Sequence, residues 1–269
     1  MGKYKLPVFY LGFVVLTGAL MGIEALVPLA LGLSLFIPAL AYLVSRDLGV
    51  SLALGISFFG LGAVWFLESW KIAMEIASFP LFGILARISK GKLKTENLIL
   101  VLSFISFGMT VIEDFFVGLP EEVQTLTWFL KLKWGLYFFS SVVISAISVG
   151  IISVVSKEDF EFKKLKFNFW LILVFLVFGF LTIIGWNETL RLVAGNFLIG
   201  ILGIFVVQGF SIFSHVLDRL SFWAKLLMFA AIVFFPVGAV ITAALAGIFD
   251  FWFDFRKLNK EVGNGDHLT

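Results

Sequence analysis

The residues most able to do chemistry lie near the C-terminal end of the chain. Asp250 and Asp254 are four residues apart and Arg256 follows them. On a helix the two carboxylates share one face, and the arginine is close enough to neutralise one of them. Such a pair binds a cation, a proton or a basic partner, and the plainer interpretation is a charged cap where an apolar helix ends. Both interpretations stay open at this stage.

Three other polar side chains lie within or beside long apolar segments. Glu24 follows Gly18 and Gly22, whose spacing lets a neighbouring helix approach closely, so its carboxylate is expected to face a bundle cavity or the headgroup level. Asn196 and Gln208 are twelve residues apart, roughly 120° around a helix, so they need not share a face. Hydrogen bonding between helices is their simplest role. Together with Asp250, Asp254 and Arg256, these residues are our candidates for lining or organising a helix bundle.

No familiar catalytic or nucleotide-binding motif is present. The sequence lacks a phosphate-binding loop, a Gly-rich dinucleotide turn and a Gly-x-Ser-x-Gly elbow. It has no cysteine and only two histidines, His215 and His267, so thiolate and paired-histidine metal sites are excluded. We therefore expect no enzymatic activity, no cofactor and no bound metal.

Composition places the chain in a lipid bilayer. Of its 269 residues 61% are hydrophobic and only 14% are charged, far from the balance of a soluble domain. The 34 phenylalanines and 8 tryptophans suit lipid contact and interfacial anchoring. A net charge of +2 is too small to indicate a surface that binds nucleic acid.

Nine apolar runs are long enough, or nearly so, to cross a bilayer core that needs roughly 20 helical residues. They cover residues 6–23, 29–44, 50–67, 72–88, 98–117, 134–155, 169–185, 192–213 and 222–249. The run over 72–88 contains Glu75 and Pro80 and is expected to be a short span. Pro236 and Gly238 break the last run into a kinked span or a re-entrant pair of half helices. The fold class predicted is an all-α integral membrane protein with eight or nine transmembrane helices.

Charge distribution predicts the topology and the domain limits. By the positive-inside rule, the N-terminus and the loops that carry most basic residues are cytoplasmic. These basic residues fall on alternate loops, at Lys3 and Lys5, at Arg46, at Arg87 to Lys94, at Lys157 to Lys166, and at Arg219 with Lys225. Nine spans would place the basic C-terminal segment outside, which the same rule disfavours, so we favour a cytoplasmic C-terminus. Residues 1–258 are expected to form one polytopic transmembrane domain, and the polar segment 259–269 is expected to be a disordered tail.

Small residues mark faces suited to tight helix packing. Ala239, Ala243 and Gly247 repeat at four-residue intervals just before the aspartates. Such a face lets another helix or another subunit come close, as Gly18 and Gly22 do near the N-terminus.

The C-terminal half resembles the YybS-like family of uncharacterised bacterial membrane proteins. The resemblance rests on the sequences Val-Gln-Gly at residues 207–209, Gly-Ile-Phe-Asp at 247–250 and Asp-Phe-Arg at 254–256, and on the hydropathy layout. The N-terminal part is similar in layout to the substrate-binding S components of energy-coupling-factor transporters and to the shape-determination protein MreD. S components typically have six spans, fewer than are predicted here.

These resemblances imply two functions. An S-component-like chain would be a membrane-embedded subunit that binds or transports an unknown small molecule and depends on an ATPase-containing complex for energy. A chain like MreD would be a non-catalytic scaffold or assembly protein of the cell envelope, working with other membrane subunits. An intramembrane enzyme using the Asp250 and Asp254 carboxylates is a third, weaker alternative. The location expected for all of them is the cytoplasmic membrane of a prokaryote.

Overall fold

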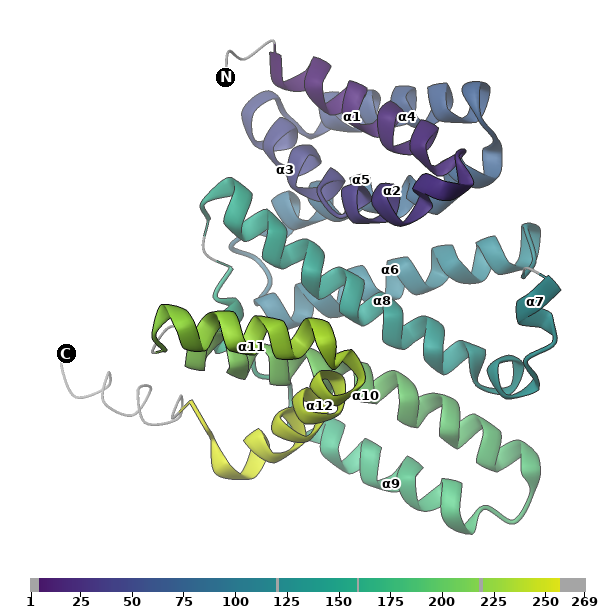
Figure 1. The fold of residues 1–269 in the computed structure, drawn as a ribbon, viewed down its shortest axis with the longest axis vertical. Helices are drawn as coiled ribbons and strands as arrows, with labels where there is room; N and C mark the ends of the chain where they lie inside the picture. Colours follow the sequence, from purple (N-terminus) through teal and green to yellow (C-terminus); the bar gives the residue numbers. More distant parts are fainter. Residues whose placement is uncertain (1–4, 120, 159, 218–219, 257–269) are drawn as a thin grey trace. The chain divides into compact units, whose positions relative to one another are not determined.

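The computed structural model describes residues 5–119, 121–158, 160–217 and 220–256. Within them the chain is helical and has no strand, which confirms the all-α expectation for this part (Figure 1). The elements are α1 (Lys5–Met21), η1 (Glu24–Leu26), α2 (Val27–Ser34), α3 (Ile37–Leu48), α4 (Val50–Leu67), α5 (Trp70–Ser89), α6 (Thr95–Phe116), α7 (Glu121–Gln124), α8 (Thr127–Ser156), η2 (Phe162–Lys164), α9 (Trp170–Ile184), α10 (Glu188–Leu217), α11 (Phe222–Phe234) and α12 (Pro236–Phe253).

The helices form two compact units. Unit 1 comprises residues within 1–126 and 144–160, and unit 2 comprises residues within 127–143 and 161–269. The long helix α8 contributes its first half to unit 2 and its second half to unit 1. Our prediction of one domain over 1–258 concerns how the units combine and stays a prediction, and the segment 259–269 lies outside the described residues.

In unit 1, α1 packs on α4 and α3 packs on α5, and α4 and α5 also contact each other. Tyr10, Ile37, Val64 and Ile76 belong to its core and are fully buried. Small residues bring these helices close, as at Gly83 of α5, where a Cβ atom would overlap the backbone of α3.

In unit 2, α10 is the central helix and packs against α9, η2 and α12. The approach of α10 and α12 is close at two glycines. A Cβ on Gly209 would overlap the carbonyl of Ala243, and one on Gly247 would overlap the carbonyl of Phe205. Only glycine allows the backbones to touch at both points, so α12 is held in one register on α10.

Six helices of the described chain are long and apolar enough to cross a membrane: α4, α5, α6, α8, α10 and α12. Many of their large apolar side chains point outwards, such as Phe66 at 89% exposure and Phe115 at 81%. An apolar surface of this kind is an aggregation liability in water and suits contact with lipid. The structure therefore fits a multi-pass membrane protein.

The run 29–44, predicted as one helix, is two helices. α2 ends at Ser34 and α3 begins at Ile37. Pro38 explains the break, because it lacks an N–H and its ring clashes with the carbonyl four residues earlier, which belongs to Ser34. A second bend, of 119°, separates α1 from the segment that continues through α2.

The last run is broken where the sequence predicted. α11 ends at Phe234 and α12 begins at Pro236, with Phe235 between them in a non-helical conformation. The residue before a proline is disfavoured in the α region, which accounts for the position of the break.

Candidate functional site

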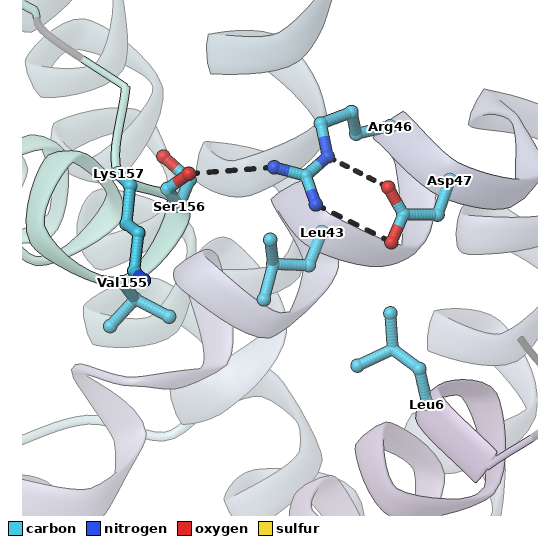
Figure 2. A pocket seen from close by; sticks show the side chains of 7 residues that line it. All are labelled: Leu6, Leu43, Arg46, Asp47, Val155, Ser156 and Lys157. Carbon is cyan, nitrogen blue, oxygen red and sulfur yellow. Dashed lines mark hydrogen bonds and ion pairs between the residues drawn. The ribbon is translucent and has the colours of Figure 1, made fainter. Parts of the chain in front are cut away.

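A cavity of about 730 Å³ lies in unit 1 where three helix ends meet. Figure 2 shows its lining, which comes from the start of α1, the last turns of α3 and the end of α8: Leu6, Leu43, Arg46, Asp47, Val155, Ser156 and Lys157. The volume lies within the range of roughly 300–1,000 Å³ that is typical of small-molecule sites.

Arg46 connects the two polar sides of this cavity. Its Nε donates to Asp47 Oδ1 at 2.7 Å, and its Nη1 donates to the backbone carbonyl of Ser156 at 3.4 Å. The guanidinium is about one-third exposed, so one face of it remains open to the cavity. It thus joins α3 to the end of α8 and still presents positive charge.

Lys157 supplies the second positive charge. It follows the last residue of α8 and has a left-handed backbone with φ 57°. Its ammonium has no ion pair with any residue that the structure describes. Beside it, the Ser156 hydroxyl is buried and has no hydrogen-bond partner in the same part of the chain.

Glu158, next to Lys157 in the chain, forms ion pairs with basic residues at and near the cavity. Lys90 and the hydroxyl of Tyr42 donate to its Oε2, and Arg46 Nη1 lies 3.7 Å from its Oε1. Partial burial acts to raise the pKa of Glu158, but the hydrogen bonds from Lys90 and Tyr42 and the charges of Lys90 and Arg46 outweigh it, so the pKa lies below its ordinary value. The carboxylate is therefore ionised at neutral pH and holds three elements together.

The wall of the cavity is cationic and apolar rather than acidic. Its wall contains one carboxylate, Asp47, and this group is paired with Arg46. No group of three or more His, Cys, Asp or Glu side chains in the described part of the chain is placed to hold a metal ion. Two cations and apolar walls suit a ligand with an anionic group and an apolar part.

A second polar centre, fully buried, lies in unit 2. Arg256 Nη2 donates to Asp250 Oδ2 at 2.6 Å, and both side chains have zero exposure. Arg256 Nη1 also donates to the carbonyl of Leu165 at 2.8 Å and to Ser211 Oγ at 2.7 Å. The ion pair thereby ties the end of α12 to α10 and to the segment before α9.

Gln208 completes this network. Its Nε2 donates to Asp250 Oδ2 at 3.2 Å, and its Oε1 accepts from the Phe167 N–H at 3.1 Å. Asp250 Oδ1 accepts the Phe255 N–H at 3.0 Å. One donor, Arg256 Nε, is buried without a partner among the described residues. Because the other groups are satisfied and inaccessible, the network is a closed clamp rather than a ligand site.

The sequence left open whether Asp250 and Asp254 form a carboxylate pair on one helix face, and the structure does not place them on one. α12 ends at Phe253, and Asp254 adopts a left-handed conformation with φ 41°. Its carboxylate lies 3.5 Å from Lys166 Nζ instead. The helix ends before the second aspartate, so the two carboxylates do not share a helical face.

Asn196 and Glu24 lie apart from the clamp. Asn196 belongs to the first half of α10, where its amide donates to the Lys131 carbonyl at 2.9 Å and its oxygen accepts the Gly135 N–H at 2.8 Å. It therefore joins α10 to α8, the role of an interhelical hydrogen bond. Glu24 is exposed at the start of η1 in unit 1 and is not part of the lining of the cavity between α1, α3 and α8.

The predicted packing residues are used within the units. Gly18 is buried against Val64 of α4, and Gly22 lies beside the Glu68 side chain. On α12, Ala243 and Gly247 are buried against α10, while Ala239 is half-buried. The small-residue face of α12 thus has a partner inside the chain.

Sequence reasoning missed the cavity. In the sequence, Arg46 and Lys157 were interpreted only as markers of membrane topology, because a basic residue at the end of an apolar run has that meaning by default. They are separated by 111 positions, and no motif links them. Pro38, in the first turn of α3, was an available signal for where that helix begins and so for where Arg46 lies.

Comparison of the chain with protein-family models, with curated proteins and with solved structures gives no match.

Proposed function

We propose that the chain is a membrane-embedded subunit that binds or transports a small molecule and has no ATPase of its own. The observation that carries this proposal is the cavity of about 730 Å³ with Arg46 and Lys157 in its wall. Its size and its mixture of apolar and cationic groups are those of a ligand site.

The contacts of unit 1 support a topology with the N-terminus in the cytoplasm. The start of α1, the end of α3 and the end of α8 meet at the cavity, and Lys90 after α5 joins them through Glu158. These four points are the basic regions that the positive-inside rule assigns to the cytoplasm. Gly22 and Glu68 meet elsewhere, after α1 and α4 have each crossed. One face of the membrane therefore collects the basic groups.

The clamp of unit 2 supports a cytoplasmic C-terminal end. Arg256 donates to the carbonyls of Lys163 and Leu165 and Asp254 pairs with Lys166, so the end of α12 lies beside the basic segment before α9. From that segment α9 and α10 cross twice, and α11 with α12 must then leave and return on the same side. We accordingly propose eight crossings and a re-entrant α11–α12 pair, with α2 and α3 together forming one broken crossing.

The cytoplasmic membrane of a prokaryote is the location we propose, in keeping with the resemblance to the YybS-like family and to S components. The scaffold alternative was motivated by the likeness in layout to MreD and by small-residue faces, of which one lies on α12. Because Ala243 and Gly247 pack on α10, less of that face is available to a partner, and we favour binding or transport.

Native mass spectrometry of the chain, extracted gently from its host membrane, tests the proposal. We expect a retained non-protein ligand that is lost in Leu43→Trp, which fills the cavity, and kept in Leu52→Trp, whose side chain points outwards from α4. Equal spectra for the two variants, or recovery of only other membrane proteins, would contradict a ligand site at the cavity.

A further inference from the structure

We infer that the cavity binds the headgroup of an anionic phospholipid from the cytoplasmic leaflet. This inference rests on the proposed function and specifies its ligand. A membrane lipid and a soluble phosphate compound could both present a phosphate ester to the cavity. The source that we favour is the membrane lipid.

The charge around the cavity selects an anion. Arg46 and Asp47 neutralise each other within the wall, and Glu158 behind it is paired with Lys90 and Arg46. Lys157 then remains as an uncompensated charge among the described residues. A phosphate diester carries one negative charge, so it balances Lys157 and accepts hydrogen bonds from the exposed part of the Arg46 guanidinium.

Helix ends at the cavity act in opposite directions. The C-terminal ends of α3 and α8 carry partial negative charge, which disfavours an anion. Arg46 offsets part of this effect, because it donates to the Ser156 carbonyl at the end of α8. The Ser156 hydroxyl, buried and unpartnered in the described chain, adds an unused O–H donor in the same wall.

The apolar part of the wall selects a lipid over a soluble phosphate. Leu6, Leu43 and Val155 face the cavity together with the cations, as Figure 2 shows. A free phosphate ion gains nothing from these side chains, whereas the glycerol and first methylenes of a lipid are stabilised by them. Basic pockets between transmembrane helices at the cytoplasmic surface are known to bind anionic headgroups by this combination.

The experiment uses the full chain in nanodiscs of equal parts phosphatidylglycerol and phosphatidylcholine with matched acyl chains, released into a mass spectrometer. We expect the wild-type chain to retain phosphatidylglycerol in preference to phosphatidylcholine. Lys157→Gln should lower that preference by about fivefold, since a cation near the surface is worth about 1 kcal/mol of lipid attraction. Lys92→Gln, an exposed lysine on the loop after α5, removes the same charge outside the cavity and should leave the preference nearly unchanged.

The possible results separate the lipid inference from the proposed function. Equal retention of both lipids, or equal losses in Lys157→Gln and Lys92→Gln, would overturn the lipid inference. Displacement of the lipid by millimolar inorganic phosphate, with a phosphate adduct in its place, would assign the site to a soluble anion. If no lipid, phosphate or other small molecule is retained even from host membranes, the proposed function fails as well. Leu43→Trp, which leaves every charge in place, should also abolish retention, and its failure to do so would count against the cavity.

Discussion

Asp250→Asn tests the buried clamp of unit 2. The substitution keeps the size of the side chain and removes the charge that Arg256 Nη2 contacts at 2.6 Å. Both side chains have zero exposure, so the arginine is left charged and buried without its counter-ion. Breaking one half of a buried ion pair costs about 3–5 kcal/mol. The Asn amide also cannot accept both hydrogen bonds that Asp250 Oδ1 and Oδ2 receive from Phe255 and Gln208.

The measurement is the free energy of unfolding in mixed micelles, followed by tryptophan fluorescence as sodium dodecyl sulfate is added. Asp254→Asn is the matched control, because its ion pair with Lys166 is partly exposed and should be worth about 0–1 kcal/mol. In a double-mutant cycle, we compare the variant that carries both Asp250→Leu and Arg256→Met with the two single variants. Its loss in free energy of unfolding should be smaller than the sum of the two single losses, by more than about 1.5 kcal/mol. Similar losses for Asp250→Asn and Asp254→Asn, or additive single effects, would refute the clamp.

Three other predictions concern packing, pH and an interhelical hydrogen bond. Gly209→Val should force α12 away from α10 and lower the free energy of unfolding by at least about 1–3 kcal/mol. Gly108→Val is the control, because a Cβ at Gly108 meets open space, and it should change the free energy of unfolding by about 0.5 kcal/mol. Equal effects of the two substitutions would exclude a close contact between α10 and α12. Because the pKa of Glu158 is lowered in the folded chain, its carboxylate stabilises the fold above the ordinary glutamate pKa of about 4.3 and this contribution fades as the pH falls further. At pH 7 the free energy of unfolding of the wild type should exceed that of Glu158→Gln by about 1 kcal/mol, and this difference should shrink in acid. A difference that does not depend on pH would contradict the ion pairs. Asn196→Ala should cost about 0.6–1.7 kcal/mol in the same unfolding assay, and a loss as large as that of Asp250→Asn would place Asn196 in a more critical network.

Helix type and most helix positions followed from the sequence because a bilayer imposes a strong constraint. A backbone in lipid must satisfy its own hydrogen bonds, so each long apolar run had to be a helix. The break at Pro236 was predictable for the same reason that prolines interrupt helices elsewhere. The break before Pro38 was missed because the run 29–44 has the length of one span, and run length was given more weight than the proline.

The clamp was only partly predictable. Arg256 was expected to neutralise one aspartate, and it contacts Asp250. The participation of Gln208 and of the carbonyls before α9 depends on how α10, α12 and the preceding segment pack, and a single sequence does not specify that packing. The end of α12 at Phe253, which turns Asp254 towards Lys166, is likewise a tertiary effect.

The cavity could not be predicted, because it is defined by three helix ends that are distant in the chain. Leu6, Arg46 and Lys157 each have an ordinary local explanation, as an apolar residue or a topological charge. Their meeting depends on the bend between α1 and α2 and on the break between α2 and α3. The site is thus a consequence of the bend between the first two apolar runs and of the break before Pro38, and run length reveals only the first of these.

The most direct test of the account is an experimental density map of the chain in nanodiscs made from host lipids, with a bound antibody fragment to allow alignment by electron cryomicroscopy. We expect non-protein density in the cavity, with a headgroup between Arg46 and Lys157 and an apolar part along Leu43. A cavity closed by its own side chains, or one that contains only solvent in such a map, would contradict the claim that this protein binds a ligand there.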